Sequence, residues 1–199
     1  MTWDDAHYDA TPAGRDEVIE LVGTNLRLTG RISLGRFPRL TDLINSTSGY
    51  IRIHEARLLR PDGEPADLDL ADLMVDQDEI SFVAELNATP HEPGSGSGSG
   101  DQGVDGSIAA RQTRRFVVFT PGHVVTGTVY IFGETDLTAF VESSHPRFVP
   151  MVDVTTRSLA DGRTTSRYPF ILMNRTQMIA AAEIDGGGQA ETVEGTPDR

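Results

Sequence analysis

The sequence predicts a mainly β (α+β) protein that consists of two tandem small β-sheet or barrel-like units, each with one short helix. Three observations support this fold class. Short β-branched runs alternate with turns that contain glycine or proline, and apolar residues recur at every second position within the runs. The order of the apolar clusters also repeats, so that Thr29 and Gly30 correspond to Thr126 and Gly127, 97 positions later. This repeat indicates an internal duplication.

The two expected units are separated and flanked by segments that are too polar to form a core. Residues 94–100 alternate glycine and serine, and both ends of the chain are poor in large apolar side chains, a composition typical of flexible coil. The expected segments are a disordered N-terminus at 1–16, a first β-rich copy at 17–86, a flexible Gly/Ser linker at 87–112, a second copy at 113–184 and a disordered tail at 185–199.

The first two strands of each copy are expected to form a hairpin. Residues 18–22 and 116–119 are short β-branched runs, and each leads into a turn, at 23–25 and at 120–123. The second strand of the first copy, at 26–34, alternates apolar and polar residues with the period of two that predicts one buried face.

A change of period then predicts a short helix in each copy. Apolar residues stand at i, i+3 and i+4, which places them on one helical face; they are Leu40, Leu43 and Ile44, and again Leu137, Phe140 and Val141. A third strand follows at 50–59 and at 148–156, where Pro150 is expected at an edge or a bulge because it has no N–H to donate. Two further strands complete each copy.

Composition excludes several classes of function. The chain has no cysteine, so it has no disulfide, thiolate zinc site or cysteine nucleophile. No apolar run approaches the length of about 20 residues that spans a bilayer. The net charge is -13, from 30 acids and 17 arginines, and this negative field opposes binding to phosphate backbones. We therefore expect a cytoplasmic protein without a cofactor or a membrane partner.

The first copy resembles an uncharacterised family of small bacterial β-rich domains. The resemblance lies in Gly30 of the second strand, in the helix at 39–45 and in the apolar strand at 50–53, and it extends to the second copy, which departs from it at Ala139 and Glu142. This family implies no activity. There is a looser likeness to Sm-type small barrels, whose second strand also carries a glycine but which lack a helix between the strands.

Residues that could carry chemistry are few. None of the five histidines has a metal-ligand spacing, and no Gly-x-Ser-x-Gly motif is present, so the sequence predicts no catalytic and no metal site. Glu55 and Asp153 occupy equivalent positions in the two copies, which favours a structural role for both acids. The alternative is an enzyme or a small-molecule-binding protein that uses Glu55, Asp153 and His145 between the two copies.

The leading hypothesis is a non-catalytic protein-binding or assembly module that binds a protein partner or itself. Its candidate binding residues are Val124, Tyr130 and Phe132, which lie on the outward face of a strand of the second copy. The first copy carries polar residues on the corresponding face, and an exposed apolar stripe is typical of a docking surface.

A second alternative is a nucleic-acid-binding, Sm-like module. Its candidate surface is a basic and aromatic patch formed by Arg114, Arg115, Arg147 and Phe148. The basic excess in the second copy is small, with 7 arginines and 6 acids over residues 114–184, whereas residues 18–86 of the first copy hold 7 arginines and 12 acids. The charge of the whole chain disfavours nucleic acid as a partner.

Overall fold

The computed structural model describes residues 15–60, 63–87, 111–132, 137–143, 145–160, 162–163 and 165–184. The fold is mainly β with two short α-helices, as the sequence predicts. The first half contains β1 (Asp16–Gly23), β2 (Arg27–Ser33), α1 (Leu40–Ser46), β3 (Tyr50–Leu59), β4 (Pro65–Asp76), the 3-10 turn η1 (Gln77–Glu79) and β5 (Ile80–Glu85). The second half contains β6 (Arg111–Phe119), β7 (His123–Phe132), α2 (Leu137–Glu142), β8 (Phe148–Ser158), β9 (Thr165–Asn174), the 3-10 turn η2 (Arg175–Gln177) and β10 (Ala180–Glu183).

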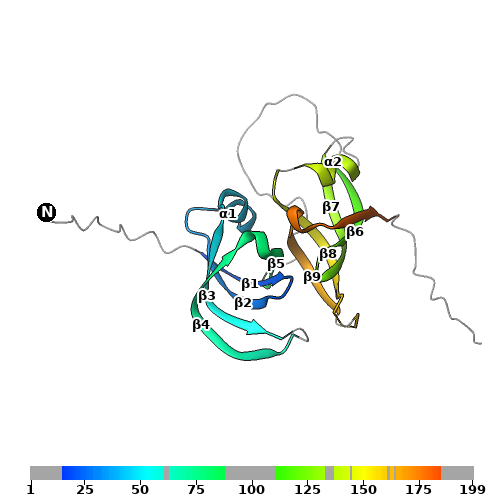
Figure 1. The fold of residues 1–199 in the computed structure, drawn as a ribbon. Coiled ribbons are helices and arrows are strands. Elements are labelled where there is room, and N and C mark those ends of the chain that lie inside the picture. Colours follow the sequence, from blue (N-terminus) through cyan, green and yellow to red (C-terminus); the bar gives the residue numbers. More distant parts are fainter. Residues whose placement is uncertain are drawn as a thin grey trace, which may run out of the picture.

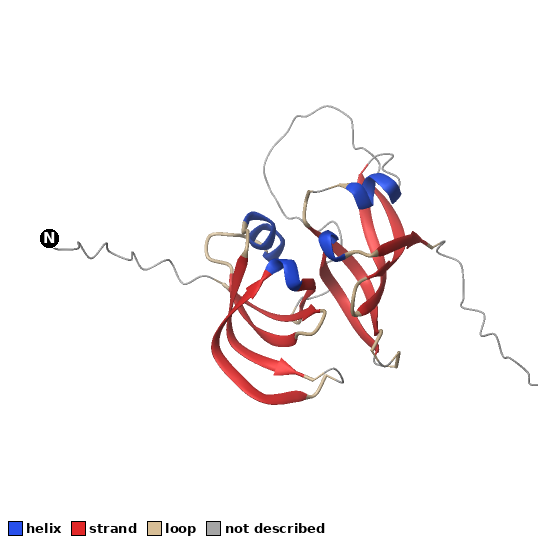
Figure 2. Cartoon of the chain, in the orientation of Figure 1, coloured by secondary structure: helices blue, strands red, loops and turns tan. Residues whose placement is uncertain are grey.

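All ten strands belong to one antiparallel sheet. Their order is β10-β6-β7-β8-β9-β5-β1-β2-β3-β4, so each half contributes five neighbouring strands. The halves meet where β5 pairs with β9, with Val83 opposite Leu172 (Figure 1). The two α-helices lie at the same end of the sheet (Figure 2). Within the described residues, no helix has the length and apolar character needed to cross a membrane.

The glycine of the second strand is required because the neighbouring third strand approaches it closely. A Cβ at Gly30 would overlap Ile53 Cγ2 and lie 3.0 Å from His54 O, and a Cβ at Gly127 would lie 2.8 Å from Val154 Cγ2. Neither position has room for a larger side chain without movement of its neighbours.

A β-bulge lies beside each of these glycines. The β2–β3 register shifts between Thr29 and Arg31, and the β7–β8 register shifts between Thr126 and Thr128. The additional residue of the longer strand is Glu55 in β3 and Asp153 in β8, with φ of 50° and 53°. Both acids therefore occupy the left-handed region, where an L-residue is strained.

Two hydrophobic clusters fill the fold, and each takes residues from both halves. The first cluster consists mainly of residues from β1 to β5 but includes Phe148 and Leu172. The second consists mainly of residues from β6 to β9 but includes Val22, Phe82 and Ala84. All five of these exchanged side chains are buried. Neither core is therefore complete without the other half.

The strands extend beyond two of the expected boundaries. β1 begins at Asp16, within the segment expected to be a disordered N-terminus, and β6 begins at Arg111, within the segment expected to be the linker. Residues 1–14, 88–110 and 185–199, which hold the rest of the expected disordered segments, lie outside the described residues. Pro150 lies in β8 beyond the last β7 pair, Thr128 with Val152, so its strand is paired there only with β9.

Candidate functional site

Of the three residues of the predicted apolar stripe, the structure describes the side chains of two, and one of these is buried. Val124 is buried, with 9% of its surface exposed, and Tyr130 is half-buried. The side chain of Phe132 lies outside the described residues. Val124 therefore offers no open surface to a partner, which is a correction to the exposure that the alternation of this strand predicts.

The three residues of the predicted catalytic alternative lie on separate parts of the fold. Glu55 and Asp153 are exposed bulge residues of β3 and β8, and four strands lie between β3 and β8 in the sheet. His145 lies before β8, at the helical end. Among the described residues, no group of three histidines and acids is placed to hold a metal ion.

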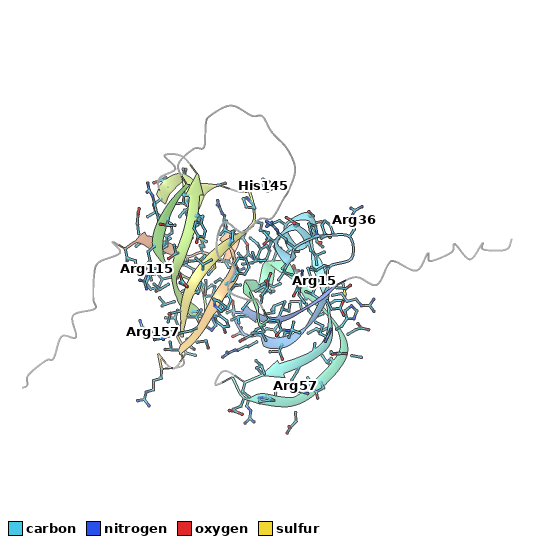
Figure 3. All side chains as sticks on the ribbon, turned by 180° about the vertical axis from the view of Figure 1, so that it is seen from behind. Arg15, Arg36, Arg57, Arg115, His145 and Arg157 are labelled. Atoms are coloured by element: carbon cyan, nitrogen blue, oxygen red, sulfur yellow. The ribbon has the colours of Figure 1, made fainter. Side chains whose placement is uncertain are left out.

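The predicted basic and aromatic patch is divided as well. Phe148 is fully buried, and the guanidinium of Arg147 lies over its ring at 5.7 Å, so this ring is not available to stack on a base. Arg114 forms an ion pair with Glu183 at 3.2 Å. The labelled arginines in Figure 3 are spread over both halves of the molecule rather than gathered on one face.

Side-chain hydrogen bonds connect the two halves at the helical end of the β5–β9 pair. Asn45, in α1, donates to Phe148 O at 2.9 Å and accepts from Phe148 N at 2.8 Å. Asn174, at the end of β9, donates its amide to Gln77 O at 3.0 Å and to Ile80 O at 2.8 Å. These four hydrogen bonds satisfy backbone groups that would otherwise be buried without partners.

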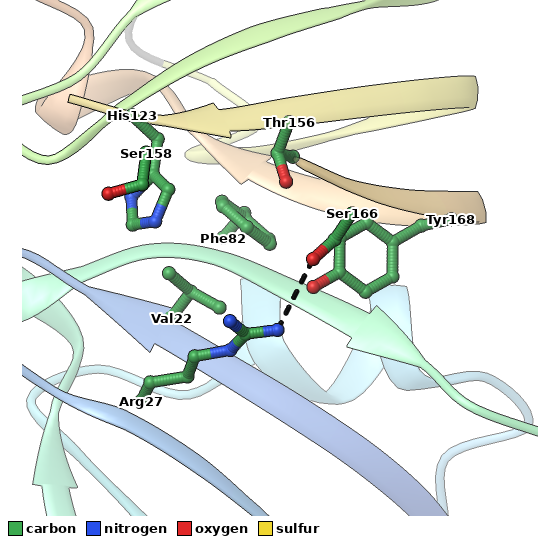
Figure 4. A pocket seen from close by; sticks show the side chains of 8 residues that line it. All are labelled: Val22, Arg27, Phe82, His123, Thr156, Ser158, Ser166 and Tyr168. Atoms are coloured by element: carbon green, nitrogen blue, oxygen red, sulfur yellow. Dashed lines mark hydrogen bonds between the residues drawn. The ribbon is translucent and has the colours of Figure 1, made fainter. Parts of the chain in front are cut away.

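A second polar cluster lies between the halves, on β1, β2 and β9. Glu20 accepts from Arg27 Nε at 2.6 Å and from the Tyr168 hydroxyl at 3.1 Å. Arg27 also donates to Ser166 Oγ at 3.3 Å, the contact drawn as a dashed line in Figure 4. Glu20 is almost fully buried, so these hydrogen bonds replace the water that burial removes from its carboxylate. The cluster therefore couples the first half to the second through one carboxylate.

Burial and charge together determine the protonation of this cluster. Burial, and then the negative charge of Glu20, raise the pKa of Tyr168 to about 12. Burial alone would lower the pKa of Arg27, but its hydrogen bond and ion pair with Glu20 outweigh burial and raise it. Burial and the nearby positive charge of Arg27 lower the pKa of His123. At neutral pH the histidine is therefore uncharged, while Glu20 and Arg27 form an ion pair.

The space within this cluster is too small for a metabolite. The cavity has a volume of about 10 Å³, which is enough for about one water molecule. His123 Nδ1 is buried and has no hydrogen-bond partner among the described residues. The arrangement suits a structural role, with one water as the most that fits beside His123.

A larger groove lies between the halves at the helical end. It has a volume of about 540 Å³ and is lined by residues from α1, η1 and the segment before β8, including Asn45, Gln77, His145 and Arg147. Gln77 is buried, and its Oε1 has no hydrogen-bond partner among the described residues. The groove is large enough for a small polar ligand.

The two outer strands of the sheet have one neighbouring strand each among the described residues. Within the described residues, β4 and β10 form the two ends of the strand order. Large apolar side chains are exposed at both ends: Tyr50 and Met74 at the β4 end, and Phe119 and Ile179 at the β10 end. Sequence analysis did not single out these residues, because the sequence does not reveal which strands end the sheet.

Comparison with protein-family models, with curated proteins and with solved structures finds no match to this chain.

Proposed function

We propose that this protein is a non-catalytic protein-binding or assembly module, in which a duplicated β unit offers the two outer edges of its sheet to a protein partner or to a second copy. The observation that carries the proposal is the β5–β9 contact, in which two strand edges of this chain already pair with each other. Within the part of the chain that the structure describes, the same type of edge remains unpaired at β4 and β10. An extended segment of a partner binds such an edge by adding a strand to it.

The distribution of charge along β4 identifies the part of the edge that is open. Natural proteins protect edge strands with charges and proline. Pro65, Asp67, Asp69 and Asp72 lie in the first part of β4, whereas residues 73–75 carry no charge. Asp76 alone separates the uncharged stretch from η1, and the exposed ring of Tyr50 lies opposite Asp76 on β3. The uncharged stretch is the part of β4 on which a partner strand would lie.

A photo-crosslinking residue at Tyr50 tests the proposal. A benzophenone side chain there would react with whatever covers the β4 edge, and we expect a discrete adduct after irradiation in native cells. Met74→Pro should abolish the adduct, because proline removes a backbone donor from the edge. The matched control places the same probe at Leu159, which is similarly exposed but lies in the turn between β8 and β9. Equal labelling at Leu159, or no adduct at Tyr50, would contradict the proposal.

A second candidate function is the binding of a small polar molecule in the groove at the helical end. The observation that favours it is the volume of the groove, about 540 Å³, together with a polar lining that includes Asn45, Gln77 and Arg147. A screen of polar metabolites by thermal shift, with Gln77→Met as the control variant, tests this candidate. A ligand that stabilises the wild-type chain but not the variant would support it, and the absence of any stabilising compound would count against it.

A further inference from the structure

The strand order of the whole sheet is a repeat of one pattern. The second half has the order β10-β6-β7-β8-β9 and the first half has the order β5-β1-β2-β3-β4. The strands therefore correspond in pairs: β10 to β5, β6 to β1, β7 to β2, β8 to β3 and β9 to β4. The contact between the halves joins β9, at one end of the second half, to β5, at the opposite end of the first half. Such a head-to-tail contact uses two different surfaces and leaves both of them free again at the ends.

We propose that β4 of one chain pairs with β10 of a second copy of the same chain, antiparallel and with Met74 opposite Ala181, so that chains assemble head to tail. This inference rests on the proposed function and names its partner. The contact would repeat the β5–β9 pairing found within the chain.

The register follows from structural markers that the two halves share. Asp76 accepts from Asp78 N at 2.9 Å and Asn174 accepts from Thr176 N at 3.1 Å, so each caps its 3-10 turn in the same way, 98 positions apart. At the other edge, Leu86 N donates to Val18 O and Ile184 N donates to Arg115 O. The counterparts of Leu172 and Val83 are therefore Met74 and Ala181.

The backbone groups at the two free edges point in the required direction. Gln77 N donates to Gly49 O, and successive N–H groups of a strand alternate in direction, so the N–H of Met74 points away from β3. By the same alternation from Ile184, the N–H of Ala181 points away from β6. In the internal contact, Leu172 and Val83 have this same direction and lie opposite each other. The free edges therefore present matching donors and acceptors.

The side chains that the internal contact buries have exposed counterparts at the free edges. The buried side chains are Val22, Phe82, Ala84, Phe148 and Leu172, and their counterparts are, in the same order, Phe119, Ala180, Ala182, Tyr50 and Met74. Leu172 is 0% exposed, whereas Met74 is 55%, Tyr50 is 57% and Phe119 is 40% exposed. Docking of a second copy would cover these side chains.

The sizes of the counterparts are also complementary. Val22 lies opposite Phe82 across the β1–β5 pair, and Phe119 lies opposite Ala180 across the β6–β10 pair. The internal contact thus has a valine beside a phenylalanine, and the free β10 edge has a phenylalanine beside an alanine. The combined volume of the two side chains is similar in both places. An exchange of this kind preserves packing when the same contact is formed.

Charge favours the same partner. The proposed contact joins the second half of one chain to the first half of the next, as the internal contact does. Residues 18–86 hold 7 arginines and 12 acids, a net charge of -5, and residues 114–184 hold 7 arginines and 6 acids, a net charge of +1. Contacts between unlike halves avoid the repulsion that two acidic first halves would experience.

One position makes the proposed contact weaker than the internal one. Asn174 donates its amide to two carbonyl groups across the internal contact, but its counterpart Asp76 has a carboxylate, which only accepts. Asp76→Asn should restore both donors and retain the acceptor that caps η1. We expect this substitution to tighten assembly on the order of tenfold, as two added neutral hydrogen bonds would.

Sedimentation velocity of the full chain, with two edge variants, tests the inference. We expect the wild-type chain to form species heavier than the 21.6 kDa monomer, whose mass rises with concentration or stops at a closed ring. Met74→Pro blocks only the β4 edge and Ala181→Pro blocks only the β10 edge, because each removes an outward donor. Each variant alone should be monomeric, and a mixture of the two should stop at a 1:1 dimer.

Circular dichroism shows whether each variant is folded, and Met74→Arg with Ala180→Arg forms a second pair if a proline variant unfolds. A wild-type chain that stays monomeric, or a mixture that forms no dimer, would overturn the inference. The Tyr50 probe separates this failure from that of the proposed function. An adduct with residues 179–184 of a second copy supports both, an adduct with another protein supports only the proposed function, and no adduct refutes both.

Discussion

Removal of the Tyr168 hydroxyl should change how the stability of the protein depends on alkaline pH. This hydroxyl donates to Glu20 at 3.1 Å, and its side chain is 7% exposed. Burial and the charge of Glu20 raise its pKa from 10.0 to about 12. The unfolded chain thus loses the proton near pH 10, while the folded chain retains it, and stability must fall as pH rises between these values.

The size of the effect follows from the shift. Each pKa unit corresponds to about 1.4 kcal/mol, so the wild-type chain should lose up to about 2.7 kcal/mol of unfolding free energy between pH 10 and pH 12. Tyr168→Phe has no proton to lose there, but it lacks the hydrogen bond, which is worth about 1 kcal/mol at neutral pH. We therefore expect the variant to be the less stable protein at pH 7 and the more stable one above about pH 11.

Urea unfolding followed by circular dichroism, at intervals from pH 7 to pH 11.5, measures both proteins. The chain has no lysine, so no lysine ammonium group titrates in this range and obscures the result. Tyr50→Phe is the matched control, because Tyr50 is 57% exposed and should show no crossing of the two curves. Parallel curves for the wild-type chain and Tyr168→Phe would refute the assigned coupling between Tyr168 and Glu20.

Four further predictions concern strain, packing, contact and pH. Glu55→Gly and Asp153→Gly should each raise the unfolding free energy by about 0.5–1 kcal/mol, because glycine relieves the left-handed backbone; a loss of stability in urea would contradict this. Gly30→Ala should lower it by about 1–3 kcal/mol in the same assay, since the added Cβ has no room. Asn45→Ala should remove about 1–3 kcal/mol by leaving backbone groups of the second half unpaired, and an unchanged midpoint would argue against that contact. Because the pKa of His123 is lowered, the unfolded chain binds the proton first, so stability should decline as pH falls below about 6.5, and His123→Phe should lose this part of the decline.

The local elements could be predicted from the sequence because their signals are local. The apolar spacing of Leu40 and Ile44 predicts α1, and both residues are buried against the core. The alternation along 26–34 predicts β2, and the bounds expected for the third strand of the first copy, 50–59, are those of β3. These elements depend on interactions between neighbours in the chain, which period and turn residues describe well.

The contact between the halves could not be predicted in this way. Arg27 lies on the polar face of β2, which alternation alone assigns to solvent, yet the second half covers it and Ser166 accepts its hydrogen bond. Val124, its counterpart, is buried as well, although alternation assigns it to the same outward face. Glu55 and Asp153 are recognisable in the sequence as a repeated acid. The repeat does not reveal the bulge, because the left-handed conformation occurs where the β2–β3 register shifts.

The pairing of β5 with β9 also determines the order in which the parts of the sheet become available during synthesis. Val83 and its partner Leu172 are 89 residues apart in the chain. At a synthesis rate of about 5–20 residues per second, β5 leaves the ribosome roughly 5–20 s before β9. During this interval the first half lacks Phe148 and Leu172 from its cluster, and Phe82 is uncovered. On a polysome, the β9 strand of a chain that was started earlier can pair with this free β5 strand. Slow translation of the second half therefore favours domain-swapped products over correctly paired monomers.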